Sequence, residues 1–432
     1  MRKILTSVAM LMSFQSPAAD LQTLTDAVKN SESAYLSTLE SLVRIDSDTG
    51  NMEGSQKIAD FIQMRLAPLG GKIEFVKSDK PGGVHVIARF AGEGRKRVLL
   101  YGHSDTVLSS KAGHGYKYDP ATKIAYGPGA ADSKGSVAML LESIRLMSEL
   151  NERPYKELIL YIDAEEEGGS KTEDELVEKL AKEVDVALIA DTGRPDFGIV
   201  TKRKASGNFT IRIKGISGHG GNAPHAGANA LTEAGYLIVE LDKLNSRFPD
   251  NPLEYTAAAL AAKGIKDRGQ FIPDNVLNIA VISTPNNKTN VIPDQVELRV
   301  NLRTYEQKEF ERIQKAIIDL AKKPRRQGVT ITVEGAQGMP PLELAGDSLK
   351  LVNAYKKVAK ATVQKEVSEW MAGGVTPANS TARFVPTIDC IGVDSDPMLE
   401  HSVKEELQVG AYVPRTIALI EFLKEIDKVQ FK

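Results

Sequence analysis

Apolar residues in the first half of the chain follow two alternating periodicities. Short apolar runs predict buried strands, and the amphipathic stretches between them have the period of a helix. The predicted strands cover residues 72–76, 83–90, 97–101, 157–162 and 186–190, and the predicted helices cover 21–45, 55–66, 133–150 and 172–182. Strands that alternate with helices predict an open, mixed but largely parallel α/β sheet.

The pattern changes near residue 204. Strands are predicted at 208–214, 276–283, 295–303 and 328–333, with helices at 229–244 and 310–323. In the run 295–303 every second residue is apolar, which predicts one buried and one polar face. The order βαββαβ is that of a ferredoxin-like α+β unit. We therefore predict a second domain, 204–336, inserted into a first domain formed by 20–203 and 337–432.

The α/β pattern returns in the C-terminal part of the chain. A helix is predicted at 348–361, a strand at 387–391 and a final helix at 405–424. At the other end, a charged start is followed by the apolar run 4–14 and by small residues at 16–19. This pattern predicts a signal peptide, 1–19, and a periplasmic or secreted protein, since the run is shorter than the ~20 residues of a membrane span. The alternative is a buried N-terminal helix.

Composition narrows the possible functions. The 432 residues contain 55 Lys and Arg against 57 Asp and Glu, so the net charge of −2 argues against a nucleic-acid partner. No segment after the N-terminal run is apolar enough to predict a membrane partner. The single cysteine, Cys390, excludes an intramolecular disulfide and a cysteine-based zinc site. A metal site would have to use the six histidines and the carboxylates.

Polar residues follow several of the predicted strands directly. His103 and Asp105 follow one strand, a run of three glutamates begins at Glu165 after another, and Asp191 follows a third. Asp132 lies in a glycine-rich loop that leads into a helix. Each has an ordinary explanation, such as a surface pair, a solvated charge run, a turn or a helix N-cap. Because parallel strands bind ligands beyond their carboxyl ends, we expect these groups to converge. A dication would relieve the resulting repulsion, and N and O donors suit zinc, or manganese or cobalt in its place.

Three motifs together carry a family resemblance. They are GHSDTV at 102–107, YGPGAADSKG at 126–135 and the pair Glu165-Glu166. They resemble the co-catalytic dizinc metallopeptidase family, which includes glutamate carboxypeptidase of the carboxypeptidase G type, aminoacylase, acetylornithine deacetylase and succinyl-diaminopimelate desuccinylase. The resemblance covers nearly the whole chain after residue 19, and the motifs most resemble the glutamate carboxypeptidase branch.

The resemblance implies two zinc ions per chain and a role for each motif residue. Five residues would hold the ions: His103, Asp132, Glu166, Asp191 and His401. His103 and Asp191 would bind one ion, Glu166 and His401 the other, and Asp132 both. Glu165 would be the general base, Asp105 would orient His103, and a cis peptide is expected after Asp132.

The inserted domain carries three further candidates. His219, in the run SGHGGNAP, resembles a lid residue that supports the tetrahedral intermediate, often across the interface of a homodimer. Asn290 and Arg303 match residues that grip the substrate carboxylate, for which a guanidinium is well suited. The alternatives are a turn residue for His219 and an outward-facing sheet charge for Arg303. The basic run 202–204, at the domain crossing, either meets an acidic substrate side chain or forms a solvated hinge.

Taken together, the sequence predicts a secreted, zinc-dependent exopeptidase that hydrolyses an amide bond next to a free carboxylate. A C-terminal glutamate-like residue is the favoured substrate, on the resemblance. An N-acyl amino acid deacylase or a dipeptidase would use the same metal core, so small peptides and N-acyl amino acids are both possible substrates. A periplasmic binding protein without catalysis is a distant alternative. The run 371–381 contains no Asp where many relatives have one, and this leaves the substrate preference open.

Overall fold

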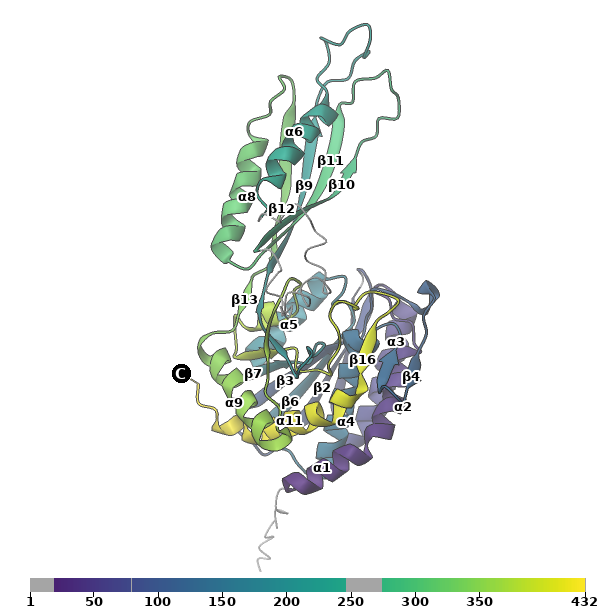
Figure 1. The fold of residues 1–432 in the computed structure, drawn as a ribbon, viewed down its shortest axis with the longest axis vertical. Helices are drawn as coiled ribbons and strands as arrows, with labels where there is room; N and C mark the ends of the chain where they lie inside the picture. Colours follow the sequence, from purple (N-terminus) through teal and green to yellow (C-terminus); the bar gives the residue numbers. More distant parts are fainter. Residues whose placement is uncertain (1–18, 79, 246–273, 432) are drawn as a thin grey trace, which may run out of the picture.

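The computed structural model describes residues 19–78, 80–245 and 274–431 (Figure 1). The predicted signal peptide therefore lies, except for Ala19, outside the described residues. The chain forms a large α/β domain and a smaller, elongated domain that projects from it (Figure 1). No helix within the described ranges combines the length and the apolar character needed to cross a bilayer.

The large domain is built on a mixed sheet with the strand order β1-β2-β6-β3-β7-β15-β8-β13, and β14 pairs with β8. The strands are β1 Lys72–Ser78, β2 Gly83–Ala91, β3 Arg97–His103, β6 Glu157–Asp163, β7 Val186–Ile189, β8 Ile199–Arg203, β13 Leu342–Glu343, β14 Glu369–Ala372 and β15 Thr387–Asp389. The central ladders β6-β3-β7-β15 are parallel, whereas β1-β2 and β2-β6 are antiparallel. The predicted mixed sheet is confirmed, with its parallel part in the middle.

Helices cover this sheet. They are α1 Leu21–Asn30, α2 Glu32–Val43, α3 Met52–Leu66, α4 Gly135–Glu149, α5 Lys171–Glu183, α9 Gly346–Val363, α10 Ala378–Thr381 and α11 Tyr412–Glu425. The first predicted helix is divided in two at Ser31, whose hydroxyl donates to the Val28 carbonyl (2.7 Å) and lies 2.7 Å from the Tyr412 hydroxyl. That side chain thus joins the break between α1 and α2 to α11, a long-range contact that no local periodicity reports.

The predicted helix at 405–424 begins too early. Residues Glu406–Gln408 form β16, which pairs with β5 (Ile124–Tyr126), and β5 pairs with β4 (Lys117–Asp119). Leu407 is fully buried in this small sheet, and only from Tyr412 does the chain continue as α11. The pairing with β5 overrides the helical pattern because it buries Leu407 against the loop that precedes α4.

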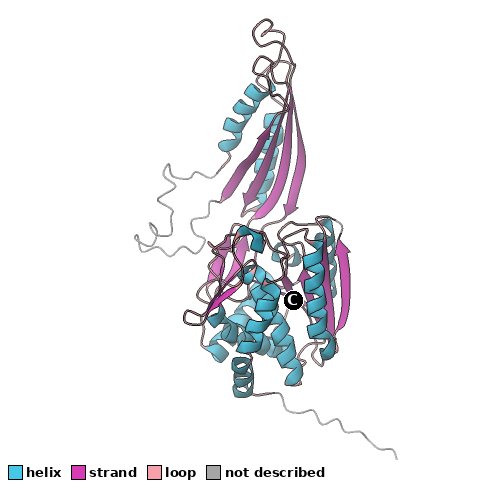
Figure 2. Ribbon diagram, turned by 90° about the vertical axis from the view of Figure 1, so that its right-hand side faces the viewer, coloured by secondary structure: helices cyan, strands magenta, loops and turns pink. Residues whose placement is uncertain are grey.

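The smaller domain contains β9 Ala205–Lys214, α6 Ala230–Asp242, β10 Asn275–Ser283, β11 Gln295–Thr304, α8 Gln307–Ala321 and β12 Thr330–Met339. Its antiparallel order β10-β11-β9-β12 is that of the predicted ferredoxin-like unit. The even-numbered residues of β11 are buried with α6 and α8 in a separate core, which confirms the predicted alternation. Both helices lie on one side of this sheet (Figure 2), so its odd-numbered β11 residues lie on a helix-free face.

Candidate metal centre

Three neighbouring parallel strands end at one edge of the large sheet. His103 is the last residue of β3 and is in register with Asp163, the last residue of β6. Asp191 follows β7 by two positions, and the three glutamates follow β6. The convergence expected from the sequence thus follows from the register, because parallel neighbours end at the same edge.

His103, Asp132 and Asp191 form a first group of possible ligands. Nε2 of His103 lies 2.9 Å from Oδ1 of Asp132 and 3.7 Å from Oδ1 of Asp191. His103 is only 1% exposed. The Asp191 carboxylate also accepts the Thr192 N–H (2.7 Å) and lies 3.5 Å from Nη2 of Arg203. One donor atom from each of the three residues lies within 4.8 Å of the others, close enough to share one ion.

A second group consists of Asp132, Glu167 and His401. Nε2 of His401 lies 3.1 Å from Oδ2 of Asp132 and 3.1 Å from Oε2 of Glu167. The His401 side chain is 49% exposed, so this group lies on the open side of the site. Asp132 belongs to both groups, with one carboxylate oxygen toward each imidazole.

Carboxylates outnumber imidazoles among the residues at this site. Burial and the charge of Asp132 raise the pKa of Glu167 to about 7, and burial raises the pKa of Glu166 well above its usual value. Oε1 of Glu167 is buried and has no hydrogen-bond partner within the described ranges. Buried carboxylates that crowd together and lack partners are costly. Divalent cations would remove that cost, so the donor set fits a metal centre.

Glu165 lies apart from both groups, which corrects its predicted position. Its carboxylate is fully buried, accepts the Gly82 N–H (2.8 Å) and the Ser170 hydroxyl, and lies 3.2 Å from Nε2 of His85. His85 in turn lies 3.1 Å from Asp163 through Nδ1. Glu165 is therefore fully buried beneath the site, where its hydrogen bonds hold the turn after β6, and it does not line the cavity described below.

Glu166 and Glu167 line the cavity above the ligand groups. No hydrogen bond or ion pair reaches the Glu166 carboxylate from the rest of the described chain. Glu166 and Glu167 therefore lie at the cavity, in the places that the resemblance implies for Glu165 and Glu166. The shift is one residue along the chain. All three acids lie in a turn, where no periodicity distinguishes them, so the sequence contained no signal for Glu167 beyond the run of glutamates itself.

Asp105 lies beside His103, as expected, and also holds the turn. Its Oδ1 is 3.4 Å from Nδ1 of His103 and accepts the Glu166 N–H (3.1 Å). Its Oδ2 accepts the Glu167 N–H (3.1 Å) and the Thr49 hydroxyl (2.7 Å). One buried carboxylate therefore orients an imidazole and fixes the backbone of the two acids.

The loop that carries Asp132 is anchored at both ends. Gly129 has a φ of 74°, and a Cβ there would lie 2.4 Å from Cγ2 of Thr106, so the turn requires glycine. The Glu405 carboxylate accepts the N–H groups of Ala131 (2.9 Å) and Asp132 (3.1 Å). The Asp132–Ser133 peptide is cis, as the resemblance implies.

The three candidates in the smaller domain do not line the cavity. His219 forms an isolated bridge with Val291, and the Gly220 N–H donates to the Asn290 carbonyl (2.8 Å), so these two lie together in exposed loops. Arg303 pairs with Ser206 at the opposite end of the β9-β11 ladder. At about 3.4 Å per residue, the length of β9 places Arg303 more than about 25 Å from the other two within one chain.

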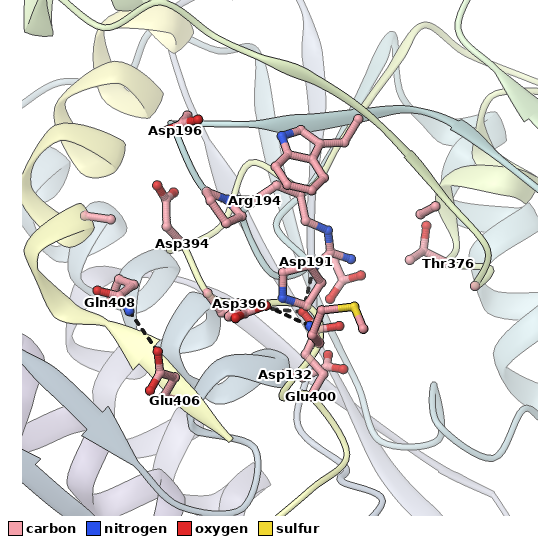
Figure 3. Close-up of a pocket in the computed structure, with 18 of the residues that line it drawn as sticks. Asp132, Asp191, Arg194, Asp196, Thr376, Asp394, Asp396, Glu400, Glu406 and Gln408 are labelled. Carbon is pink, nitrogen blue, oxygen red and sulfur yellow. Dashed lines mark hydrogen bonds and ion pairs between the residues drawn. The ribbon is translucent and has the colours of Figure 1, made fainter. Parts of the chain in front are cut away.

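The cavity above the ligand groups has a volume of about 1270 Å³ (Figure 3). Trp370, Met371 and Asp394 also line it. Met371 begins the run 371–381 that the sequence singles out, whereas Trp370, in the short strand β14, and Asp394, in a connection, lie in no motif and were not predicted. In the run 371–381, Asn379 donates to the carbonyls of Lys204 (3.1 Å) and Pro340 (2.8 Å), so an amide is the polar anchor of that loop.

Comparison with known proteins agrees with this geometry. Residues 201–329 match the peptidase dimerisation domain, and residues 85–193 match peptidase family M28. Carboxypeptidase G2 from Pseudomonas sp. (strain RS-16) is 26% identical over 91% of this chain and 89% of its own, and succinyl-diaminopimelate desuccinylase from Burkholderia ambifaria is 25% identical over 87% and 95%. A dinuclear metal-binding peptidase of the M20 family from Bacillus subtilis has the same fold, with a TM-score of 0.65 and 15% identity over 93% of this chain and all of its own. The chain is thus similar, over most of its length, to peptidases and amidohydrolases of the M20 family.

Proposed function

We propose that this chain is a dinuclear zinc exopeptidase that hydrolyses an amide bond next to a free carboxylate. The observation that carries the proposal is the pair of ligand groups that share Asp132, with the Glu166 carboxylate beside them in a large cavity. His103 and Asp191 would hold one ion, Glu167 and His401 the other, and Asp132 both. Two bound dications would polarise the scissile carbonyl and lower the pKa of water.

Glu166 is the proposed general base. Its carboxylate lines the cavity and is not committed to a partner within the described chain, and the raised pKa suits a group that accepts a proton and releases it again. In the reaction it takes the proton of the attacking water and passes it to the leaving nitrogen. Asp105 keeps Glu166 in place through the backbone N–H.

Arg303 is the proposed partner of the substrate's free carboxylate. Nη1 of Arg303 is buried without a hydrogen-bond partner among the described residues, and Nε donates to Oδ1 of Asn301 (2.9 Å). A guanidinium with open donors suits a carboxylate. A glutamate-like C-terminal residue is favoured by the similarity to carboxypeptidase G2, and the similarity to a desuccinylase keeps an N-acyl amino acid deacylase as the alternative.

A homodimer is proposed to complete the site. His219 and Asn290 lie at the far end of the smaller domain from Arg303, and exposed Val281 and Ile282 lie on β10, the edge strand of its sheet. The match to a peptidase dimerisation domain supports pairing through this domain. In such a dimer, the second copy would bring His219 and Asn290 to the metal centre.

Export to the periplasm or the extracellular space is a separate proposal, which rests on the N-terminal pattern alone. N-terminal sequencing of the protein isolated from its native cells tests it: a mature chain that starts after residue 18 or 19 is expected. A chain that retains residues 1–18 would contradict export by this signal.

A hydrolysis screen tests the proposed reaction. Metal-loaded protein is offered N-acyl amino acids and dipeptides, each with a free and with an amidated C-terminus. We expect hydrolysis of the free acids and a large loss with the amides. Equal turnover of both forms would contradict an exopeptidase and leave a general amidohydrolase.

A further inference from the structure

Ala19, which precedes α1, is held by two side chains from distant parts of the chain. The Ala19 N–H donates to Oε1 of Glu152 (2.6 Å), and the Ala19 carbonyl accepts from Nζ of Lys424 (2.9 Å). Glu152 lies in the connection between α4 and β6, and Lys424 lies in the last turn of α11. Helix α1 lies at the end of the large domain that points away from the smaller domain (Figure 1). These contacts therefore hold the beginning of the large domain and do not belong to the active cavity.

The charged groups around Ala19 include more carboxylates than cations. Glu152 and Glu421 share the Lys424 ammonium, with N–O distances of 3.3 and 2.9 Å, and all three side chains are 16% exposed or less. Asp20 adds a further carboxylate at the position where it caps α1. Within the described ranges, no second cation forms an ion pair with Glu152 or Glu421. Because a mostly buried carboxylate is costly without a full charge partner, this cluster is short of one positive charge.

The residues before Ala19 have the pattern of a processing site. A signal peptidase requires small residues directly before the cut and two positions earlier. For a cut before Ala19, these residues are Ala18 and Ser16. A cut before Asp20 would place Pro17 in the earlier position, and it would remove the one residue that both buried side chains bind. Sequence pattern and contacts therefore favour the same peptide bond.

We propose that export processing cuts the chain between Ala18 and Ala19, and that the α-ammonium group released at Ala19 is the missing cation of this cluster. A signal peptidase hydrolyses the amide with one water molecule. The Ala18 carbonyl carbon receives the oxygen and becomes a carboxylate, and the Ala19 nitrogen receives both protons. Glu152 then accepts from a charged donor, and such a hydrogen bond is stronger than one from a neutral N–H. The inference rests on the proposed export and goes beyond the proposed reaction.

The pKa of the Ala19 α-amino group tests the ammonium site. Chain 19–432, released from a removable tag, is acylated with an amine-reactive reagent between about pH 6 and pH 10, and mass spectrometry measures the rate at Ala19. The carboxylates of Glu152, Glu421 and Asp20 oppose the single charge of Lys424, so this pKa should lie at least about one unit above its ordinary value of about 7.8. At neutral pH the amine should therefore react at least about 10-fold more slowly than an exposed one.

Two variants show which carboxylate is responsible. Glu152→Gln should return the pKa of the Ala19 amine to its ordinary value, whereas a loosened chain end alone would change the rate at every pH by the same factor. Glu149→Gln is the matched control, since Glu149 is exposed and pairs with Arg145, and it should leave the pKa unchanged. An ordinary pKa in the parent chain, or the same raised pKa in Glu152→Gln, would overturn the inference.

A longer chain separates the ammonium from an ordinary amide. In chain 16–432 the Ala19 nitrogen is an amide, so Glu152→Gln should lower the thermal midpoint by about 1–3 °C less there than in chain 19–432. Equal decreases in both chains would show that Glu152 accepts only an amide N–H, and would overturn the inference.

The first residue of the protein from its native cells tests the cut itself. Ala19 is expected. A chain that begins at Asp20 would overturn this inference and leave export intact, whereas a chain that retains residues 1–18 would overturn both. The hydrolysis screen is independent of either result, so a failure of the proposed reaction remains distinguishable.

Discussion

The candidate residues of the metal centre lie close together, whereas those of the smaller domain lie far apart. At the metal centre, His103, Asp105 and Asp132 lie at strand ends or in loops that are held by hydrogen bonds. Each of them contacts at least one other member of the site. In the smaller domain, His219 is exposed and Arg303 lies at the other end of the sheet. All ligands of the candidate metal centre therefore come from one domain, whereas the proposed contacts to substrate would depend on how the domains and the two copies of the proposed dimer meet.

This difference predicts two kinds of defect. Changes at the metal centre should abolish turnover of every substrate. Changes in the smaller domain should leave metal binding intact and reduce turnover according to the groups that the substrate carries.

Metal removal should have the largest effect. Chelation followed by buffer exchange should abolish hydrolysis, and zinc, cobalt or manganese should restore it, because the two ligand groups contain only nitrogen and oxygen donors. Metal analysis should give about two ions per chain. Full activity in protein shown by mass spectrometry to be free of metal would exclude a metal-dependent reaction.

His219→Ala should reduce turnover by about 10²- to 10³-fold, as for the loss of a group that stabilises an oxyanion. If His219 acts in the partner's site, a mixture with inactive Glu166→Gln protein should regain activity. Random pairing makes half of the dimers mixed, with one intact site each, so about a quarter of the parental activity is expected. Mixing after chemical cross-linking of each variant is the control. No recovery from a mixture proven to exchange subunits would mean that His219 acts within its own chain or not at all.

Arg303→Ala should lower kcat/KM by about 10²-fold, because a substrate carboxylate loses its charged partner. The metal content should stay unchanged. An amidated substrate should lose a similar factor on the parent enzyme and little more on the variant, since both changes delete the same contact. Additive losses would show that Arg303 and the carboxylate do not meet.

Asp105→Asn should have the smallest effect of the four. It removes the negative charge next to Nδ1 of His103 and leaves the fold of the turn largely intact, because the amide oxygen still accepts one N–H. Metal affinity should fall by about 10- to 100-fold, while kcat at saturating metal changes less. Competition with a chromophoric chelator measures the affinity. An unchanged affinity would mean that Asp105 serves only the backbone.

Much of the fold could be predicted because it depends on local periodicity. The alternation of Leu298 with Arg299, and the βαββαβ order around it, were sufficient for the ferredoxin-like sheet. The strand at Glu406–Gln408 was missed because it is held by its pairing with β5, far away in sequence. The break at Ser31 was missed for the same reason, since its hydroxyl contacts Tyr412.

The candidate site was predictable where residues follow strands. His103 and Asp191 lie close together because parallel strands end at one edge, which a strand pattern contains. The order of the three glutamates was not predictable, since their directions depend on what the turn packs against. His85, Ser170 and Gly82 draw Glu165 inward, and the next two acids are turned toward the cavity.

Glu166 is assigned as the base, Glu167 as a metal ligand and Glu165 as a buried support of the turn. The most direct test of these three roles is to measure the metal content and kcat of Glu165→Gln, Glu166→Gln and Glu167→Gln side by side. Glu166→Gln should keep both ions and lose about 10²- to 10⁴-fold in kcat, since only the proton acceptor is removed. Glu167→Gln should lose one ion. Glu165→Gln should keep both ions and most of its turnover, with a lower thermal midpoint because a buried network is disturbed. If instead Glu165→Gln keeps its metals and loses turnover while Glu166→Gln loses an ion, the base and the ligand lie one residue earlier, and the account is contradicted.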